Sequence, residues 1–93
     1  MYYVRLTGTI SRQNRWEFEQ TFRIFSSEIP TSCSGYFIAK DVLNENIYHF
    51  ISYWPNLESF ESFVNSTPYN MLTGSFRTLG ELSENSRRKL VSF

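Results

Sequence analysis

The sequence has few of the residues from which disulfides and metal sites are built. Its 93 residues include one cysteine, Cys33, and one histidine, His49. One cysteine cannot form an internal disulfide, and the pair cannot supply the ligands of a zinc site. We therefore expect no metal site, and the scarcity of cysteine favours a reducing, cytoplasmic location.

An excess of charge of one sign is also missing. Nine Lys and Arg residues balance nine Asp and Glu residues, for a formal net charge of +0. The chain thus lacks the long-range field that attracts nucleic acids and anionic membranes. No apolar run approaches the length that spans a bilayer, and the N-terminal stretch MYYVRLTGTISR lacks the basic start and apolar core of an export signal. We expect neither a nucleic acid nor a membrane as partner.

Aromatic residues, in contrast, are abundant. Hydrophobic residues make up 41% of the chain and aromatic residues 18%, so the chain has enough apolar surface to fold. Its length predicts a single domain over residues 1–93. A domain of this size has a small stability margin, which association with a second copy would increase.

Alternating and helical patterns predict the elements. Residues 2–10 alternate as a strand with Val4, Leu6 and Ile10 on one face, and Gly8 predicts a bulge or the close approach of another group. Ser11 is a candidate N-cap for a helix that ends before Pro30, and its apolar stripe comprises Phe18, Phe22, Phe25 and Ile29. The other side of this helix carries Arg15, Glu19 and Arg23, which we interpret as a solvated surface.

The second half of the chain predicts a hairpin, a split helix and a last strand. Strands are expected over residues 35–41 and 47–53, joined by a turn at 43–46. Asn56 is expected to cap a helix, and a second helix is expected to begin at Thr67-Pro68. Gly74 and Gly80 are expected to make this second helix less stable. Residues 84–86 suggest a turn, and residues 88–93 suggest an edge strand.

This order of elements predicts an antiparallel sheet with its helices on one face. Too many large side chains then remain for the other face to be exposed to water. They are Tyr3, Ile47 or Phe50, Tyr36 or Phe37, and Phe93. We therefore expect a homodimer through the sheet faces.

A recognisable pattern follows the third strand. An aromatic strand ends in tryptophan, and a helix follows with spaced polar and aromatic positions, namely Trp54, Glu58, Ser59, Phe60, Phe63, Asn65 and Ser66. This pattern resembles the antibiotic biosynthesis monooxygenase (ABM) superfamily of dimeric α+β barrels, over most of the chain. The resemblance implies an α+β, ferredoxin-like βαββαβ fold, pairing of two sheets, and ligands bound between sheet and helices.

The same resemblance separates two kinds of chemistry. Haem-degrading members use a tryptophan and a later histidine at places that fall at Phe63 and Thr73 here, and threonine offers no imidazole to iron. Cofactor-free members deprotonate a phenolic substrate with scattered polar side chains. Candidates for such a set are His49, Tyr48, Trp54, Asn65, Tyr69 and Arg5.

Our hypothesis is a cofactor-independent monooxygenase for a small phenolic or quinol-like aromatic substrate. His49 is the predicted base because its unperturbed pKa is near neutrality, and Trp54, Phe63 and Tyr69 are the predicted pocket walls. Packing alone also explains all four residues. The alternative is a non-catalytic homodimer that binds a small molecule or another protein.

RNA binding is a third hypothesis, because RNA-recognition domains share this order of elements and stack bases on sheet aromatics. The stretch from Phe50 to Tyr53 is faintly similar to their third-strand signature, but the preceding basic residue and glycine are missing. The neutral net charge further disfavours this hypothesis.

Overall fold

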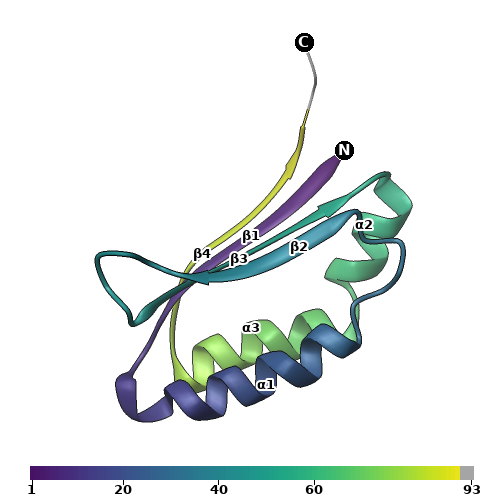
Figure 1. The fold of residues 1–93 in the computed structure, drawn as a ribbon. Helices are drawn as coiled ribbons and strands as arrows, with labels where there is room; N and C mark the ends of the chain where they lie inside the picture. The colour runs from purple at the N-terminus through teal and green to yellow at the C-terminus, as the bar shows by residue number, and fades with distance from the viewer. Residues whose placement is uncertain (91–93) are drawn as a thin grey trace.

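A computed structural model describes residues 1–90 (Figure 1). In chain order, its elements are β1 (Tyr2–Ile10), a short 3-10 helix η1 (Arg12–Asn14), α1 (Arg15–Ser27), β2 (Gly35–Lys40), β3 (Ile47–Trp54), α2 (Leu57–Val64), α3 (Thr67–Leu79) and β4 (Gly80–Lys89). Among the helices of residues 1–90, none combines the length and the hydrophobicity that a membrane-spanning helix requires.

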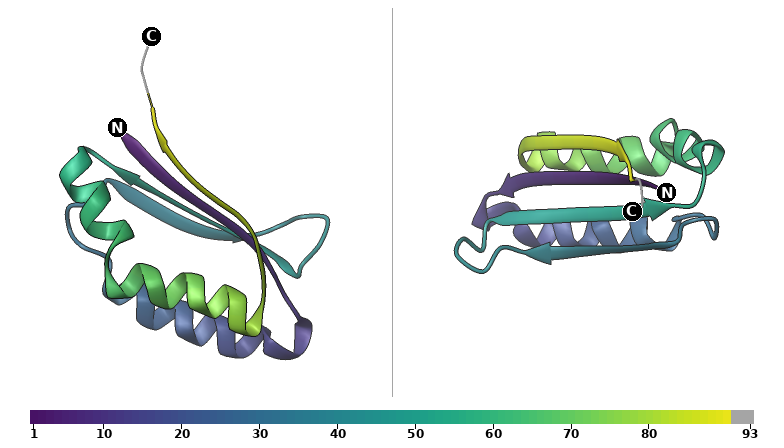
Figure 2. Two further views of the ribbon diagram at one scale, coloured as in Figure 1. Left: turned by 180° about the vertical axis from the view of Figure 1, so that it is seen from behind. Right: turned by 90° about the horizontal axis from the view of Figure 1, so that it is seen from above.

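The strands form one antiparallel sheet in the order β2-β3-β1-β4. Figures 1 and 2 show the helices together on one side of this sheet, which leaves its other side open. The predicted α+β, ferredoxin-like arrangement is therefore confirmed. The hairpin between β2 and β3 extends beyond the end of the sheet in both figures.

Alternation along β3 determines which side chains reach the helices. Tyr48, Phe50, Ser52 and Trp54 are buried against the helices, and the residues between them lie on the open face. The core between sheet and helices is mostly aromatic: from α1, Phe25 packs against Phe50 of β3 and Phe18 against Tyr48 of β3. Phe50 is thus inside the core, where it cannot stack on an RNA base.

Helix ends differ from the prediction at several places. Ser11 makes no side-chain capping bond, and η1 comes between it and α1, which ends at Ser27 before Ile29. Asn56 caps α2 as predicted, because its side chain accepts a hydrogen bond of 2.9 Å from the backbone N–H of Ser59. The cap of α3 is Ser66, whose hydroxyl oxygen accepts from the N–H of Tyr69.

The prediction for the last strand was wrong in its position. β4 begins at Gly80, and the expected turn at 84–86 pairs with Arg5, Leu6 and Thr7 of β1. Polar residues are compatible with a strand here because β4 is an edge strand with few buried positions. The end of the predicted strand, residues 91–93, lies outside the described residues.

Gly8 has the role that its place in the strand predicts. The pairing of β1 with β4 shifts register between Thr7 and Gly8. A Cβ atom at Gly8 would collide with the ring of Phe76 and the carbonyl oxygen of Glu81. Glycine therefore lets α3 pack closely on the sheet at this bulge.

Candidate functional site

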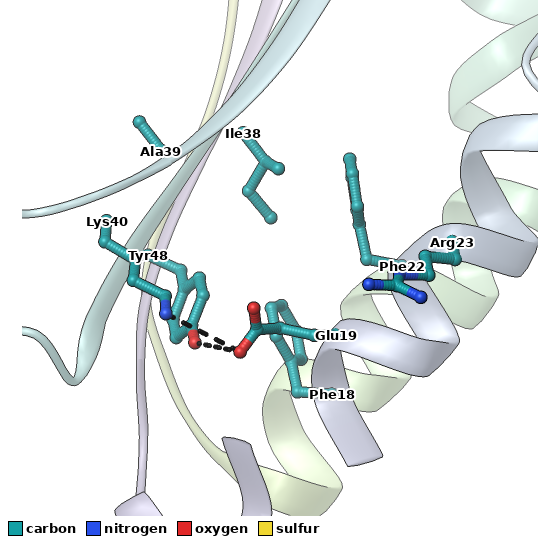
Figure 3. A pocket seen from close by; sticks show the side chains of 8 residues that line it. All are labelled: Phe18, Glu19, Phe22, Arg23, Ile38, Ala39, Lys40 and Tyr48. Atoms are coloured by element: carbon teal, nitrogen blue, oxygen red, sulfur yellow. Dashed lines mark hydrogen bonds and ion pairs between the residues drawn. The ribbon is translucent and has the colours of Figure 1, made fainter. Parts of the chain in front are cut away.

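A cavity of about 350 Å³ lies on the helix side of the sheet, between α1 and the edge formed by β2 and β3. Figure 3 shows its lining: Phe18, Glu19, Phe22 and Arg23 from α1, Ile38, Ala39 and Lys40 from β2, and Tyr48 from β3. The two buried members are Phe18 and Tyr48, whereas Arg23, Ala39 and Lys40 are exposed. The cavity therefore has an aromatic floor and a charged rim.

Glu19 is the polar centre of this cavity. Its Oε2 accepts a hydrogen bond of 3.2 Å from the hydroxyl of Tyr48 and lies 3.6 Å from Nζ of Lys40. The other carboxylate oxygen, Oε1, has no hydrogen bond to residues 1–90, and in Figure 3 it points toward Ile38. One oxygen is thus fixed by two donors, and the other faces the cavity.

The electrostatic surroundings keep Tyr48 protonated. Burial, followed by the nearby negative charge of Glu19, raises the pKa of Tyr48 from 10.0 to about 12. The phenol therefore remains a hydrogen-bond donor throughout the physiological pH range. Lys40 Nζ also lies 5.7 Å from the centre of the Tyr48 ring, so the cation contacts both the ring and the carboxylate.

This arrangement fits a small aromatic molecule that carries a hydroxyl group. Phe18, Phe22 and Ile38 offer apolar contacts, and small-molecule sites typically combine such walls with a few polar groups in volumes of roughly 300–1,000 Å³. A phenol bound here could donate its proton to Glu19. Lys40 would then stabilise the charge that develops on oxygen.

His49, the predicted base, lies on the open face of the sheet and does not line this cavity. Its Nδ1 is 3.2 Å from Oγ1 of Thr7, and its Nε2 is 3.3 Å from Oδ1 of Asp41. Backbone N–H groups, foremost that of Leu43, and the bond to His49 lower the pKa of Asp41 from 3.8. His49 therefore helps to fix the β2-β3 hairpin on the face away from the helices.

The three predicted pocket walls are packed against one another. The Trp54 and Phe63 rings stack with their centres 4.5 Å apart, and Tyr69 lies against Phe63 at 5.3 Å. None of the three is more than 3% exposed, and none lines the cavity. The structure thus brings these three residues together as core and separates them from His49.

The other candidates from the resemblance are engaged elsewhere. Arg5 lies on the open face, with its Nε 3.5 Å from Oε1 of Glu84. Asn65 is exposed, and its side chain donates to the carbonyl oxygen of Glu61 at the end of α2. Within residues 1–90, no three His, Cys, Asp or Glu side chains gather as metal ligands.

We did not predict that Glu19, Arg23 and Lys40 line a cavity, although the sequence contains part of the evidence for it. The hairpin pairs Lys40 with Tyr48 and Ile38 with Phe50, so these side chains share the helix-facing side of the sheet. Glu19 follows Phe18 and therefore lies beside the apolar stripe of α1 rather than opposite it. Only the packing of α1 beneath β2 joins these two observations.

Solved structures of several proteins share this fold at low sequence identity. A protein from Deinococcus radiodurans, provisionally named an antibiotic biosynthesis monooxygenase, matches with a TM-score of 0.82 and 13% identity over 100% of this chain and 95% of its own. A mutant of SnoaB, a cofactor-independent oxygenase from Streptomyces nogalater, matches with a TM-score of 0.75 and 16% identity over 99% of this chain and 94% of its own. A conserved protein from Methanosarcina mazei matches with a TM-score of 0.78 and 13% identity over 94% of this chain and 87% of its own. No protein-family model and no curated protein matches the sequence. The chain therefore has the fold of the antibiotic biosynthesis monooxygenases.

Proposed function

We propose that this protein binds a small phenolic or quinol-like aromatic molecule in the cavity and oxidises it with O₂, without a metal or organic cofactor. The observation that supports this function is the Glu19 carboxylate, which has one oxygen directed into an otherwise mainly apolar cavity. Among the similar folds, SnoaB is a cofactor-independent oxygenase, which makes this chemistry compatible with the fold.

In the proposed reaction, Glu19 accepts the proton of the substrate hydroxyl. The resulting phenolate is electron-rich and transfers electrons to O₂, while Lys40 stabilises the negative oxygen. One oxygen atom of O₂ becomes the new carbonyl of a quinone. The other leaves as water with the proton from the hydroxyl and the hydrogen from the oxidised carbon.

We also propose that two copies pair through the open faces of their sheets, in the cytoplasm. Tyr3, Ile51 and Tyr53 are only half-buried on this face, and Phe37 is 47% exposed. Their side chains form an apolar surface, and such surfaces commonly mark interfaces. Because the cavity lies on the helix side, it would remain accessible in this dimer.

The oxidation is tested by O₂ consumption and product analysis with a panel of quinols and hydroxyanthracenes. We expect Glu19→Gln to lower the rate by roughly 100-fold or more, as loss of a general base does. Glu17→Gln is the matched control, because Glu17 lies on α1 but does not line the cavity. No O₂ uptake by the wild type, or equal rates for both variants, would contradict the proposal.

A non-catalytic dimer that binds the same class of ligand is the second candidate. It is favoured by the packing of Trp54, Phe63 and Tyr69, which fills the space between sheet and helices where they lie. A binder of this kind predicts that ligands raise the unfolding temperature without being converted. Turnover of the stabilising ligand distinguishes the enzyme from the binder.

A further inference from the structure

The rim of the cavity carries more positive than negative charge. Arg23 comes from α1 and Lys40 from β2, and Glu19 is the one carboxylate in the lining. Two cations and one anion leave a formal charge of +1. Lys40 already pairs with Glu19 at 3.6 Å, whereas no carboxylate within residues 1–90 forms an ion pair with Arg23.

Arg23 therefore offers an unused guanidinium beside an aromatic floor. It is exposed, whereas Phe18 beneath the cavity is buried. A guanidinium recognises a carboxylate through two parallel hydrogen bonds, which gives both charge and shape selectivity. The polar partner for a ligand hydroxyl, Glu19, is one helical turn away from Arg23.

We infer that the ligand is a phenol that also carries a carboxylate, of the hydroxybenzoate or hydroxynaphthoate class. Its hydroxyl lies at Glu19 and Tyr48, its ring lies against Phe18 and Phe22, and its carboxylate pairs with Arg23. Because Lys40 offsets the negative charge of Glu19, Glu19 does not strongly repel the carboxylate of the ligand. This inference rests on the proposed use of the cavity as a ligand site but does not require the oxidation.

Binding of two ligands of the same shape but different charge tests the inference. Dissociation constants of para-hydroxybenzoate and para-hydroxybenzamide are measured by titration calorimetry, without O₂ and at low salt. We expect the wild type to prefer the carboxylate by roughly threefold, the equivalent of one exposed ion pair. Arg23→Gln should abolish this preference. Arg77→Gln, at an exposed position near the end of α3, should retain it.

The outcomes separate the inference from the proposed reaction. A preference for para-hydroxybenzoate that disappears in Arg23→Gln supports the inference, even if no ligand consumes O₂ and the oxygenase is thereby contradicted. Equal affinity for acid and amide, or a preference that survives in Arg23→Gln, overturns the inference, even if neutral phenols are oxidised. Binding of neither ligand overturns it as well.

Discussion

The hydroxyl of Tyr48 on β3 donates a hydrogen bond of 3.2 Å to the carboxylate of Glu19 on α1. This bond joins the helix to the sheet across the cavity. It also fixes one oxygen of Glu19, which leaves the other available to a ligand. The bond thus connects the packing of α1 to the chemistry that we propose for the site.

The raised pKa of Tyr48 predicts a specific loss of stability in alkali. Because the folded-state pKa of about 12 exceeds the ordinary tyrosine value of 10.0, neutral Tyr48 stabilises the fold fully below pH 10. This contribution is lost as the pH rises through the folded-state value. Denaturant unfolding should therefore show that the advantage of wild type over Tyr48→Phe is constant up to pH 10 and then shrinks.

Tyr36→Phe is the control for this measurement, since Tyr36 is 41% exposed on β2. Its effect on the free energy of unfolding is measured over the same pH range as that of Tyr48→Phe. If the difference in the free energy of unfolding between wild type and Tyr48→Phe stays constant above pH 10, Tyr48 ionises as readily in the folded chain as in the unfolded chain, which would contradict the prediction.

Two glycine substitutions should change stability in opposite directions. Gly8→Ala forces the ring of Phe76 or the backbone at Glu81 to move, and we expect a loss of about 1–3 kcal/mol. A Cβ atom at Gly74 meets nothing within 4 Å, and this position is inside α3. Gly74→Ala should therefore raise the free energy of unfolding by roughly 0.5–1 kcal/mol. Thermal and denaturant unfolding of both variants measure these changes, and a tolerated Gly8→Ala would contradict the close packing of α3.

Asp41 should contribute to stability in a way that fades in acid. Its pKa is lowered from 3.8 by the N–H of Leu43 and by His49, so the ionised form stabilises the fold above that value. The contribution is lost as the pH falls through the lower folded-state pKa. Between about pH 5 and 2, the free energy of unfolding should therefore fall more steeply for the wild type than for Asp41→Asn. Glu61→Gln, on the exposed side of α2, is the matched control for the loss of one carboxylate.

The proposed dimer predicts a face-specific effect of added charge. Ile51 lies in the middle of the open face, and Ile51→Glu would place a carboxylate in the interface. We expect the dissociation constant of the dimer to rise at least roughly tenfold, measured by analytical ultracentrifugation. Trp16→Glu is the control on α1, where Trp16 is 74% exposed. A dimer weakened by Trp16→Glu instead would place the interface on the helices.

The sequence predicts the layers of the fold because strand and helix periodicities each bury one face. Alternation along β3 separates Phe50 and Trp54 from His49, and the stripe of α1 places Phe18 and Phe25 in the core. β4 was misplaced because an edge strand needs little apolar alternation, so its polar residues look like a turn. Local pattern is informative only where a strand has a buried face.

The candidate site was less predictable than the fold, for a related reason. Trp54, Phe63 and Tyr69 have the residue types of a pocket, but their side chains fill the available volume themselves. Whether a space remains depends on how α1 packs against β2, and these elements meet only in three dimensions. Glu19 has a helical position that is also typical of a solvated surface, so its sequence position alone gives no indication of a cavity.

The most direct test of this account is the location of a bound ligand. Amide chemical shifts of the isotopically labelled protein are followed by NMR while para-hydroxybenzoate is added. We expect the largest changes at Glu19, Phe22 and Ile38, which line the cavity, and Glu19→Gln should reduce them. Changes centred on His49 and Ile51, or no saturable change at all, would contradict the claim that the cavity beside α1 is the functional site.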